Sequence, residues 1–155
     1  MKWSPPPMIK IYEALGAIGD DRIKVDGNTA RVYSSSRSKF YEVVFDPITN
    51  AITANDNGSY WRGYLGYPII TFLLKSGRIN FKPQFSRALK NIAWKDVNTK
   101  FKNDFAKTEL SAREIMSSRD VDLAEFDQEL ARIANEIKKL DLRKLPSKLK
   151  PPTTY

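Results

Sequence analysis

The sequence contains neither cysteine nor histidine among its 155 residues. Without cysteine there is no disulfide, no thiolate nucleophile and no cysteine-ligated zinc or iron–sulfur cluster. Without histidine the chain lacks the commonest general base and the commonest transition-metal ligand, so serine–histidine and cysteine–histidine catalysis are excluded. Carboxylates remain available for Mg²⁺ or Ca²⁺, and an enzyme of that kind is a third alternative. We expect no enzymatic activity and no cofactor.

Long hydrophobic runs are also absent. The longest apolar stretch, Tyr64 to Leu74, is about half as long as a membrane-spanning helix needs. The N-terminal Met-Lys-Trp-Ser-Pro-Pro-Pro lacks the apolar core of a secretory signal. We therefore expect a cytoplasmic protein that has no membrane partner.

Glycine is scarce and scattered, with seven residues in the chain, and no phosphate-binding loop or dinucleotide fingerprint is present. Hydrophobic residues make up 41% and charged residues 28%, which is typical of globular proteins. The length suits one domain that has its own core.

The net charge of +8 is unevenly distributed. Residues 78–107 carry eight basic and two acidic side chains, whereas residues 108–137 carry three basic and eight acidic ones. Residues 138–155 are basic again. Two basic segments on either side of an acidic one suggest an anionic partner, or a solvated surface.

The first half of the chain has the pattern of a helix followed by strands. Apolar residues at helical spacing predict a helix over 8–19. Alternating residues then predict four short strands joined as a meander, with the turn residues Asp26 and Gly27 at the two positive-φ positions of the first hairpin. The strands are expected at 22–25, 29–34, 39–45 and 51–54. Residues 55–58 lack the carboxylate spacing of a calcium loop, so we interpret them, with Asp56, as a turn.

A helix is predicted over 60–76. Pro68 interrupts this pattern, unless the regular helix begins near Pro68, where proline fits the first turn. Further helices are predicted over 83–93 and 95–107.

Two capping patterns predict the C-terminal helices. Ser111 and Glu114 form a capping box, flanked by a hydrophobic staple of Leu110 and Ile115, which predicts a helix over 112–118. Asp122 is the expected N-cap of a longer helix over 123–143 that Pro146 ends.

The apolar positions of that last helix follow a strict heptad spacing. They predict a helix–helix seam, formed by Leu123, Phe126, Leu130, Ile133, Ile137 and Leu140. Packing on helices 83–118 of the same chain is the favoured interpretation, because three heptads are few for a coiled coil. Association with another protein or a second copy through this seam is the alternative.

Two segments are candidate binding surfaces. The first is an aromatic segment made of Tyr60, Trp61, Arg62, Tyr64 and Tyr67. Its rings can stack on bases or a flat ligand, but packing against the sheet is favoured, because aromatic side chains mostly lie in cores. The second is basic and offers contacts for RNA or DNA, through Arg87, Lys90, Lys95, Lys100 and Lys102.

Together these elements predict an α+β fold: an N-terminal helix, an antiparallel meander of about four strands covered by a helix, and an all-helical C-terminal third. The element order of residues 1–77 loosely resembles a TATA-binding-protein half-repeat, a resemblance that implies no function. We divide the chain into a proline-rich, mobile leader (1–7), an α+β core (8–107), a helical region packing on the core or a partner (108–145), and a flexible basic tail (146–155). The predicted function is a non-enzymatic interaction module, and the alternative is a nucleic-acid-binding protein that uses residues 78–107 and the tail.

Overall fold

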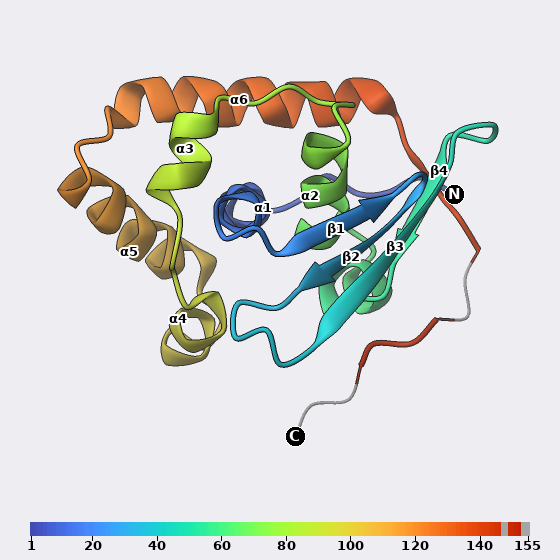
Figure 1. Cartoon of the computed structure of the whole chain (residues 1–155), viewed down its shortest axis with the longest axis horizontal. Coiled ribbons are helices and arrows are strands. Elements are labelled where there is room, and N and C mark those ends of the chain that lie inside the picture. Colours follow the sequence, from blue (N-terminus) through green and yellow to red (C-terminus); the bar gives the residue numbers. More distant parts are fainter. Residues whose placement is uncertain (147–148, 153–155) are drawn as a thin grey trace.

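The computed structural model describes residues 1–146 and 149–152 and has the predicted α+β architecture (Figure 1). The helices are α1 (Met8–Gly19), α2 (Tyr67–Lys75), α3 (Pro83–Ala88), α4 (Trp94–Lys100), α5 (Phe105–Ser118) and α6 (Leu123–Leu140). The strands are β1 (Ile23–Asp26), β2 (Thr29–Tyr33), β3 (Phe40–Asp46), β4 (Ala51–Ala54) and β5 (Arg143–Lys144). A π-helical turn, η1 (Gly58–Arg62), lies between β4 and α2.

The sheet has the order β1-β2-β3-β4-β5, and its first four strands form the predicted antiparallel meander. Tyr41, Val43 and Phe45 on β3 are buried, as their alternation predicts. The first turn is shifted by one residue from the prediction, because Asp26 pairs with Thr29 and only Gly27 of the expected pair has a positive φ, 61°.

β5 was not predicted. It pairs in parallel with β4, where Arg143 N donates to Asn50 O. The predicted helix over 123–143 is therefore too long: α6 ends at Leu140, and Asp141 adopts a left-handed conformation with a φ of 50°. The edge of β4 offers hydrogen-bond partners to residues 143–144. The charge pattern that predicted the end of the helix contains no information about this strand pairing.

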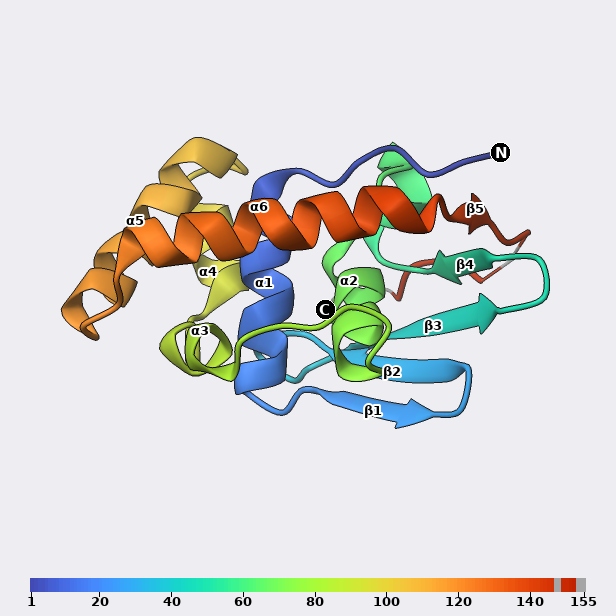
Figure 2. The same cartoon turned by 90° about the horizontal axis from the view of Figure 1, so that it is seen from above.

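One hydrophobic core joins the sheet and the helices. α2 packs on the sheet, α1 packs beside α2, and α6 crosses α1 on the outside (Figure 2). Phe126 of α6 contacts Tyr12 and Phe85 through its ring, with centroid distances of 5.0 and 5.4 Å. The boundary predicted between 107 and 108 falls inside α5, and both halves share the same core.

The heptad seam is buried within the chain itself. Phe126, Leu130, Ile133 and Ile137 lie in the core, and Leu123 and Leu140 pack at its margin. α6 contacts α1 and α5. Packing within the same chain therefore describes the seam, although α1, outside the predicted range 83–118, is one of its partners.

The capping box at Ser111 is wrong as a helix start. α5 begins at Phe105, because the side chain of Asp104 accepts a hydrogen bond from Lys107 N and caps the helix earlier. Ser111 consequently lies inside the helix, and Leu110 is exposed rather than stapled to Ile115. The cap at Asp122 is confirmed, since its Oδ1 accepts from the N–H groups of Ala124 and Glu125.

The helix predicted over 60–76 is split. α2 begins at Tyr67 with Pro68 in its first turn, which confirms the alternative start, and the preceding residues form η1 and a short link. The helices predicted over 83–93 and 95–107 end earlier, as α3 at Ala88 and α4 at Lys100. Asn91, Lys102 and Asn103 have positive φ angles, which a continuing helix does not accept.

Contacts hold the N-terminal leader, contrary to its predicted mobility. Trp3 Nε1 donates to Ile52 O at 3.0 Å, and Ser4 pairs with the backbone on either side of Tyr64. At the other end of the chain, Asn55 Nδ2 donates to Lys150 O at 2.9 Å. The remainder of the predicted tail, 147–148 and 153–155, lies outside the described residues.

Candidate functional site

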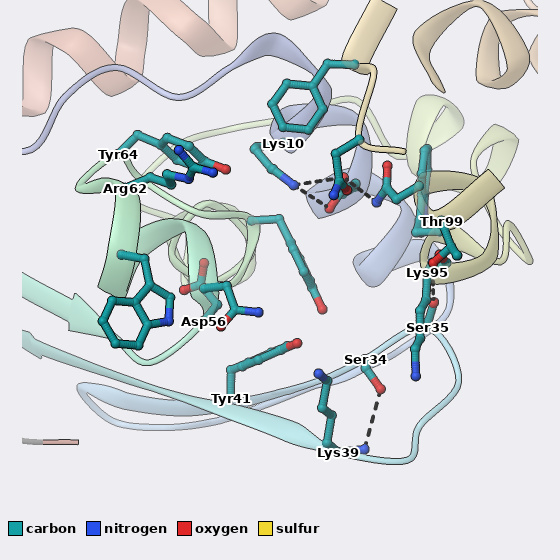
Figure 3. A pocket seen from close by; sticks show the side chains of 18 of the residues that line it. Lys10, Ser34, Ser35, Lys39, Tyr41, Asp56, Arg62, Tyr64, Lys95 and Thr99 are labelled. Carbon is teal, nitrogen blue, oxygen red and sulfur yellow. Dashed lines mark hydrogen bonds and ion pairs between the residues drawn. The ribbon is translucent and has the colours of Figure 1, made fainter. Parts of the chain in front are cut away.

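A cavity of about 830 Å³, here named the central pocket, lies between α1, β3, η1 and α4 (Figure 3). Its wall combines five basic side chains with two acidic ones. The basic side chains are Lys10, Arg22, Lys39, Arg62 and Lys95, and the acidic ones are Glu13 and Asp56.

The two candidate surfaces from the sequence meet at this pocket. Four residues of the aromatic segment line it, namely Trp61, Arg62, Tyr64 and Tyr67. From the basic segment Lys95 lines it as well. Tyr60 lies just outside and contacts Trp61 edge-on, with ring centroids 4.6 Å apart. The other four basic residues are exposed and lie outside the pocket. Arg87 is in α3 and Lys90 follows it, while Lys100 is the last residue of α4 and Lys102 follows it.

The π-helical turn η1 positions the aromatic wall. π-turns are rare and occur frequently at functional sites. In this turn Trp61 is 70% exposed at the pocket. The turn also brings the ring of Tyr64 so close to Gly58 that a β-carbon at position 58 would lie 2.5 Å from it. Gly63 ends the turn with a φ of 72°, a conformation that favours glycine. The backbone of residues 58–63 thus directs Trp61, Arg62 and Tyr64 to one place.

Arg22 is buried in the wall with an unused donor. Its side chain donates through Nε to Asp20 Oδ2 at 3.1 Å and through Nη1 to Tyr33 O at 2.7 Å. Its Nη2 is buried and has no hydrogen-bond partner among the described residues, although Arg22 is only 1% exposed. Leaving a buried donor unpaired costs about 1–3 kcal/mol, more for a charged group.

Trp94 supplies a second unused donor. Its Nε1 is buried without a partner in the described part of the chain. The indole lies against α1, where a β-carbon at Gly16 would stand 2.8 Å from Nε1. Since buried polar groups are normally hydrogen-bonded, these two donors are candidates for contacts with a ligand.

Asp56 supplies an unused acceptor. Its Oδ2 accepts from Ser59 N at 3.1 Å, but its buried Oδ1 has no partner within residues 1–146 and 149–152. Burial raises the pKa of the Asp56 carboxyl, and the hydrogen bonds from Ser59 only partly oppose that rise. All three orphan atoms of the described side chains therefore belong to residues of this pocket.

The basic side chains are incompletely neutralised. Lys10 Nζ pairs with Glu13 Oε1 at 3.2 Å; burial lowers the pKa of Lys10, but Glu13 and Tyr64 raise it by more. Lys39, Arg62 and Lys95 form no ion pair with any described carboxylate. Burial lowers the pKa of Lys39, and the neighbouring Lys95 lowers it further. This pair therefore adds positive charge to the wall that is not neutralised by a direct ion pair with a described carboxylate.

Three tyrosine hydroxyls add further donors. Tyr41, Tyr64 and Tyr67 line the pocket, and none of these hydroxyls has a hydrogen-bond partner in the described ranges. Burial raises the pKa of Tyr41 to about 12 and also raises the pKa of Tyr67 and Tyr64. All three phenols are thus protonated at neutral pH and can donate hydrogen bonds.

The wall suits an oxygen-rich anion better than a metal ion. Its free donors outnumber its free acceptors, as expected where a phosphate or carboxylate binds. Asp56 and Glu13 are the acidic residues that line the pocket, and the described residues contain no cluster of three acidic side chains suited to a metal. The carboxylate of Asp20 pairs with Arg22 instead.

Sequence reasoning missed most of the basic wall and the acid. The wall residues that the sequence did not identify include Lys10, Arg22, Lys39, Tyr41, Asp56 and Trp94. They come from α1, β3, α4 and the segments just before β1, just before β3 and just after β4, and only the folded chain brings them together. One usable signal exists in α1, where Lys10 and Glu13 interrupt an otherwise apolar sequence.

Within the described residues, no helix combines the length and the apolar character required to cross a bilayer. Comparison with curated proteins and with solved structures gives no match. Residues 3–143, however, match a protein family along most of the chain. The chain belongs to that family, which is described as "Uncharacterised conserved protein UCP014422".

Proposed function

We propose that this protein is a non-enzymatic binding module that holds a small, oxygen-rich anion in the central pocket. The observation that carries the proposal is that two residues with buried, unpaired donors, Arg22 and Trp94, line a cavity with excess positive charge. A ligand oxygen that reaches either donor would remove the cost of burying it unpaired.

The charge of the pocket supports an anion. Lys39 and Lys95 repel each other in the empty protein, so a ligand of negative charge relieves this repulsion. Arginine and lysine together suit phosphate or carboxylate groups, because Arg22 offers a directed donor and the lysines act as point charges. The pocket volume also lies within the usual range for small-molecule sites.

The experiment is a thermal-shift and calorimetric titration of the full chain with inorganic phosphate and citrate. Glucose serves as a neutral, oxygen-rich control, and potassium chloride controls for ionic strength. We expect stabilisation by phosphate or citrate only. Equal effects of all solutes, or no binding by either anion at millimolar concentration, would contradict the proposal.

A paired set of variants locates the binding. Lys39→Gln with Lys95→Gln should lower anion affinity at least about tenfold, because two charge-assisted contacts are lost. Lys75→Gln changes the same residue type at an exposed position outside the pocket and should leave affinity unchanged. An equal loss in both variants would show a non-specific surface effect.

The alternative function is nucleic-acid binding through the basic segment. It is favoured by the exposure of Arg87, Lys90, Lys100 and Lys102. A mobility-shift assay at two salt concentrations tests it, because phosphate contacts weaken steeply with salt. Lys95→Glu, Lys100→Glu and Lys102→Glu together should abolish the shift, and wild type that shows none at low salt would end this alternative. A cytoplasmic location is part of both proposals.

A further inference from the structure

The two sides of the central pocket differ in charge. Lys39 and Lys95 stand with Ser35 on one side, here named the cationic side (Figure 3). Asp56 stands with Arg62 and Tyr64 on the other side (Figure 3). A small symmetric anion satisfies only the cationic side, so the wall is built for a ligand with two unlike ends.

Asp56 determines what the second end must carry. Its Oδ1 is buried and unpaired, and an acceptor of this kind needs an N–H or O–H donor from the ligand. Phosphate and carboxylate groups that are fully ionised offer no such donor. The second end therefore carries an N–H or O–H donor, such as a base edge or a sugar hydroxyl.

Trp61 adds a flat apolar surface beside that acid. The ring is 70% exposed in the ligand-free protein, and Tyr60 supports it edge-on at a centroid distance of 4.6 Å. Arg62, the next residue, is also exposed. Exposed aromatic rings beside an arginine are the usual platform on which a nucleic-acid base stacks.

We propose, as an extension of the anion-binding function above, that the ligand is a nucleoside phosphate. Its phosphate lies between Lys39 and Lys95, its base stacks on Trp61, and a base or ribose donor reaches Asp56 Oδ1. The same chemistry is present in a free mononucleotide and in the terminal nucleotide of a single strand. The volume of about 830 Å³ accommodates a unit of this size.

The test is calorimetric titration of the full chain with four probes: inorganic phosphate, ribose 5-phosphate, adenosine and adenosine 5′-monophosphate. The nucleotide should bind about tenfold or more tightly than ribose 5-phosphate, because stacking adds affinity. Adenosine should bind more weakly than the nucleotide, since it lacks the phosphate. Uridine 5′-monophosphate extends the test to a pyrimidine.

Variants assign the two ends separately. Trp61→Ala should reduce nucleotide affinity to that of ribose 5-phosphate and leave ribose 5-phosphate binding unchanged. Phe40→Ala is the matched control, since it removes a partly exposed aromatic ring outside the pocket. Asp56→Asn should weaken the nucleotide and spare inorganic phosphate, because its contact is made by the nucleoside.

The outcomes separate this inference from the proposed function. Nucleotides that bind no more tightly than ribose 5-phosphate overturn the inference and leave anion binding intact, whereas no binding by any phosphate or by citrate overturns both. A 5′-phosphorylated trinucleotide distinguishes the two sources. Tighter binding of the trinucleotide than of the mononucleotide supports a strand end, and weaker binding supports a free nucleotide.

Discussion

Gly66 lies so close to Asp56 that a β-carbon at position 66 would stand 2.0 Å from Asp56 Oδ2 and 2.7 Å from Ser59 Oγ. Gly66 N also donates to that Oγ at 3.1 Å. Since the φ of Gly66 is −72°, its backbone is open to any residue, and the close approach is the reason for glycine here. Gly66 thus holds the buried carboxylate in place at the start of α2.

Gly66→Ala should therefore displace Asp56 and weaken nucleotide binding at the central pocket. The overlap with the carboxylate should destabilise the fold by about 1–3 kcal/mol, measured by urea unfolding. Gly27→Ala is the control, because its φ of 61° is strained for alanine but no atom lies within 4 Å of its β-carbon. Both variants should lose stability and only Gly66→Ala should lose nucleotide affinity. If Gly66→Ala binds normally, the role of Asp56 is wrong.

Asp56 should make stability depend on pH. Burial raises its folded-state pKa above the unfolded value of about 4. The folded state then holds the proton more tightly, so stability is highest at low pH and falls as pH rises from the unfolded to the folded pKa. Asp56→Asn removes this fall and should be more stable than wild type at neutral pH in the absence of ligand.

Urea unfolding of the two proteins between pH 4 and pH 8 measures this difference. It should be close to zero near pH 4, where both side chains are neutral, and should increase with pH. A difference that is independent of pH would contradict the buried, raised-pKa environment of Asp56.

The burial of the heptad seam predicts a loss of stability without a change of mass. Leu130 is 3% exposed, so Leu130→Ala should lower the free energy of unfolding by about 2–5 kcal/mol. Leu110→Ala is the matched control, because Leu110 is 62% exposed and should change stability by less than about 0.5 kcal/mol. Sedimentation should give the same mass for both variants and wild type. A lower mass for Leu130→Ala alone would instead support association through the seam.

Anion binding should weaken as salt concentration rises. Lys39 and Lys95 lie at a partly exposed wall, where ions screen their attraction for the ligand. Calorimetry at low and high potassium chloride should show a clear loss of affinity in wild type. In the double variant Lys39→Gln, Lys95→Gln the remaining affinity should change much less, and an unchanged salt dependence would assign binding to other cations.

Local patterns predicted most of the fold. The helix over 8–19 and the strand over 51–54 are present with those bounds, because their apolar spacing agrees with the core that they enter. The errors occur where contacts with residues distant in the sequence, or a competing cap, determine where a helix begins or ends. The edge of β4 pairs with Arg143 and ends the helix early, and Asp104 begins α5 before the more conspicuous pattern at Ser111.

The central pocket was only half predictable. Trp61, Arg62 and Tyr64 lie within four positions of one another in the sequence, so their aromatic and basic composition predicts a candidate surface. Arg22 and Asp56, in contrast, look like ordinary turn and strand-end residues, and only their burial with unpaired atoms gives them a role. No spacing rule links residues that meet from separate helices, strands and connecting segments.

The most direct test of the anion site follows the three tryptophan indole N–H signals by ¹⁵N NMR during titration with inorganic phosphate. Trp94 Nε1 is the buried donor without a partner, whereas Trp3 Nε1 already donates to Ile52 O. Binding in the central pocket should move the Trp94 signal strongly, as its N–H gains an acceptor, and leave the Trp3 signal in place. A stationary Trp94 signal at saturating phosphate, or equal movement of all three, would contradict the account.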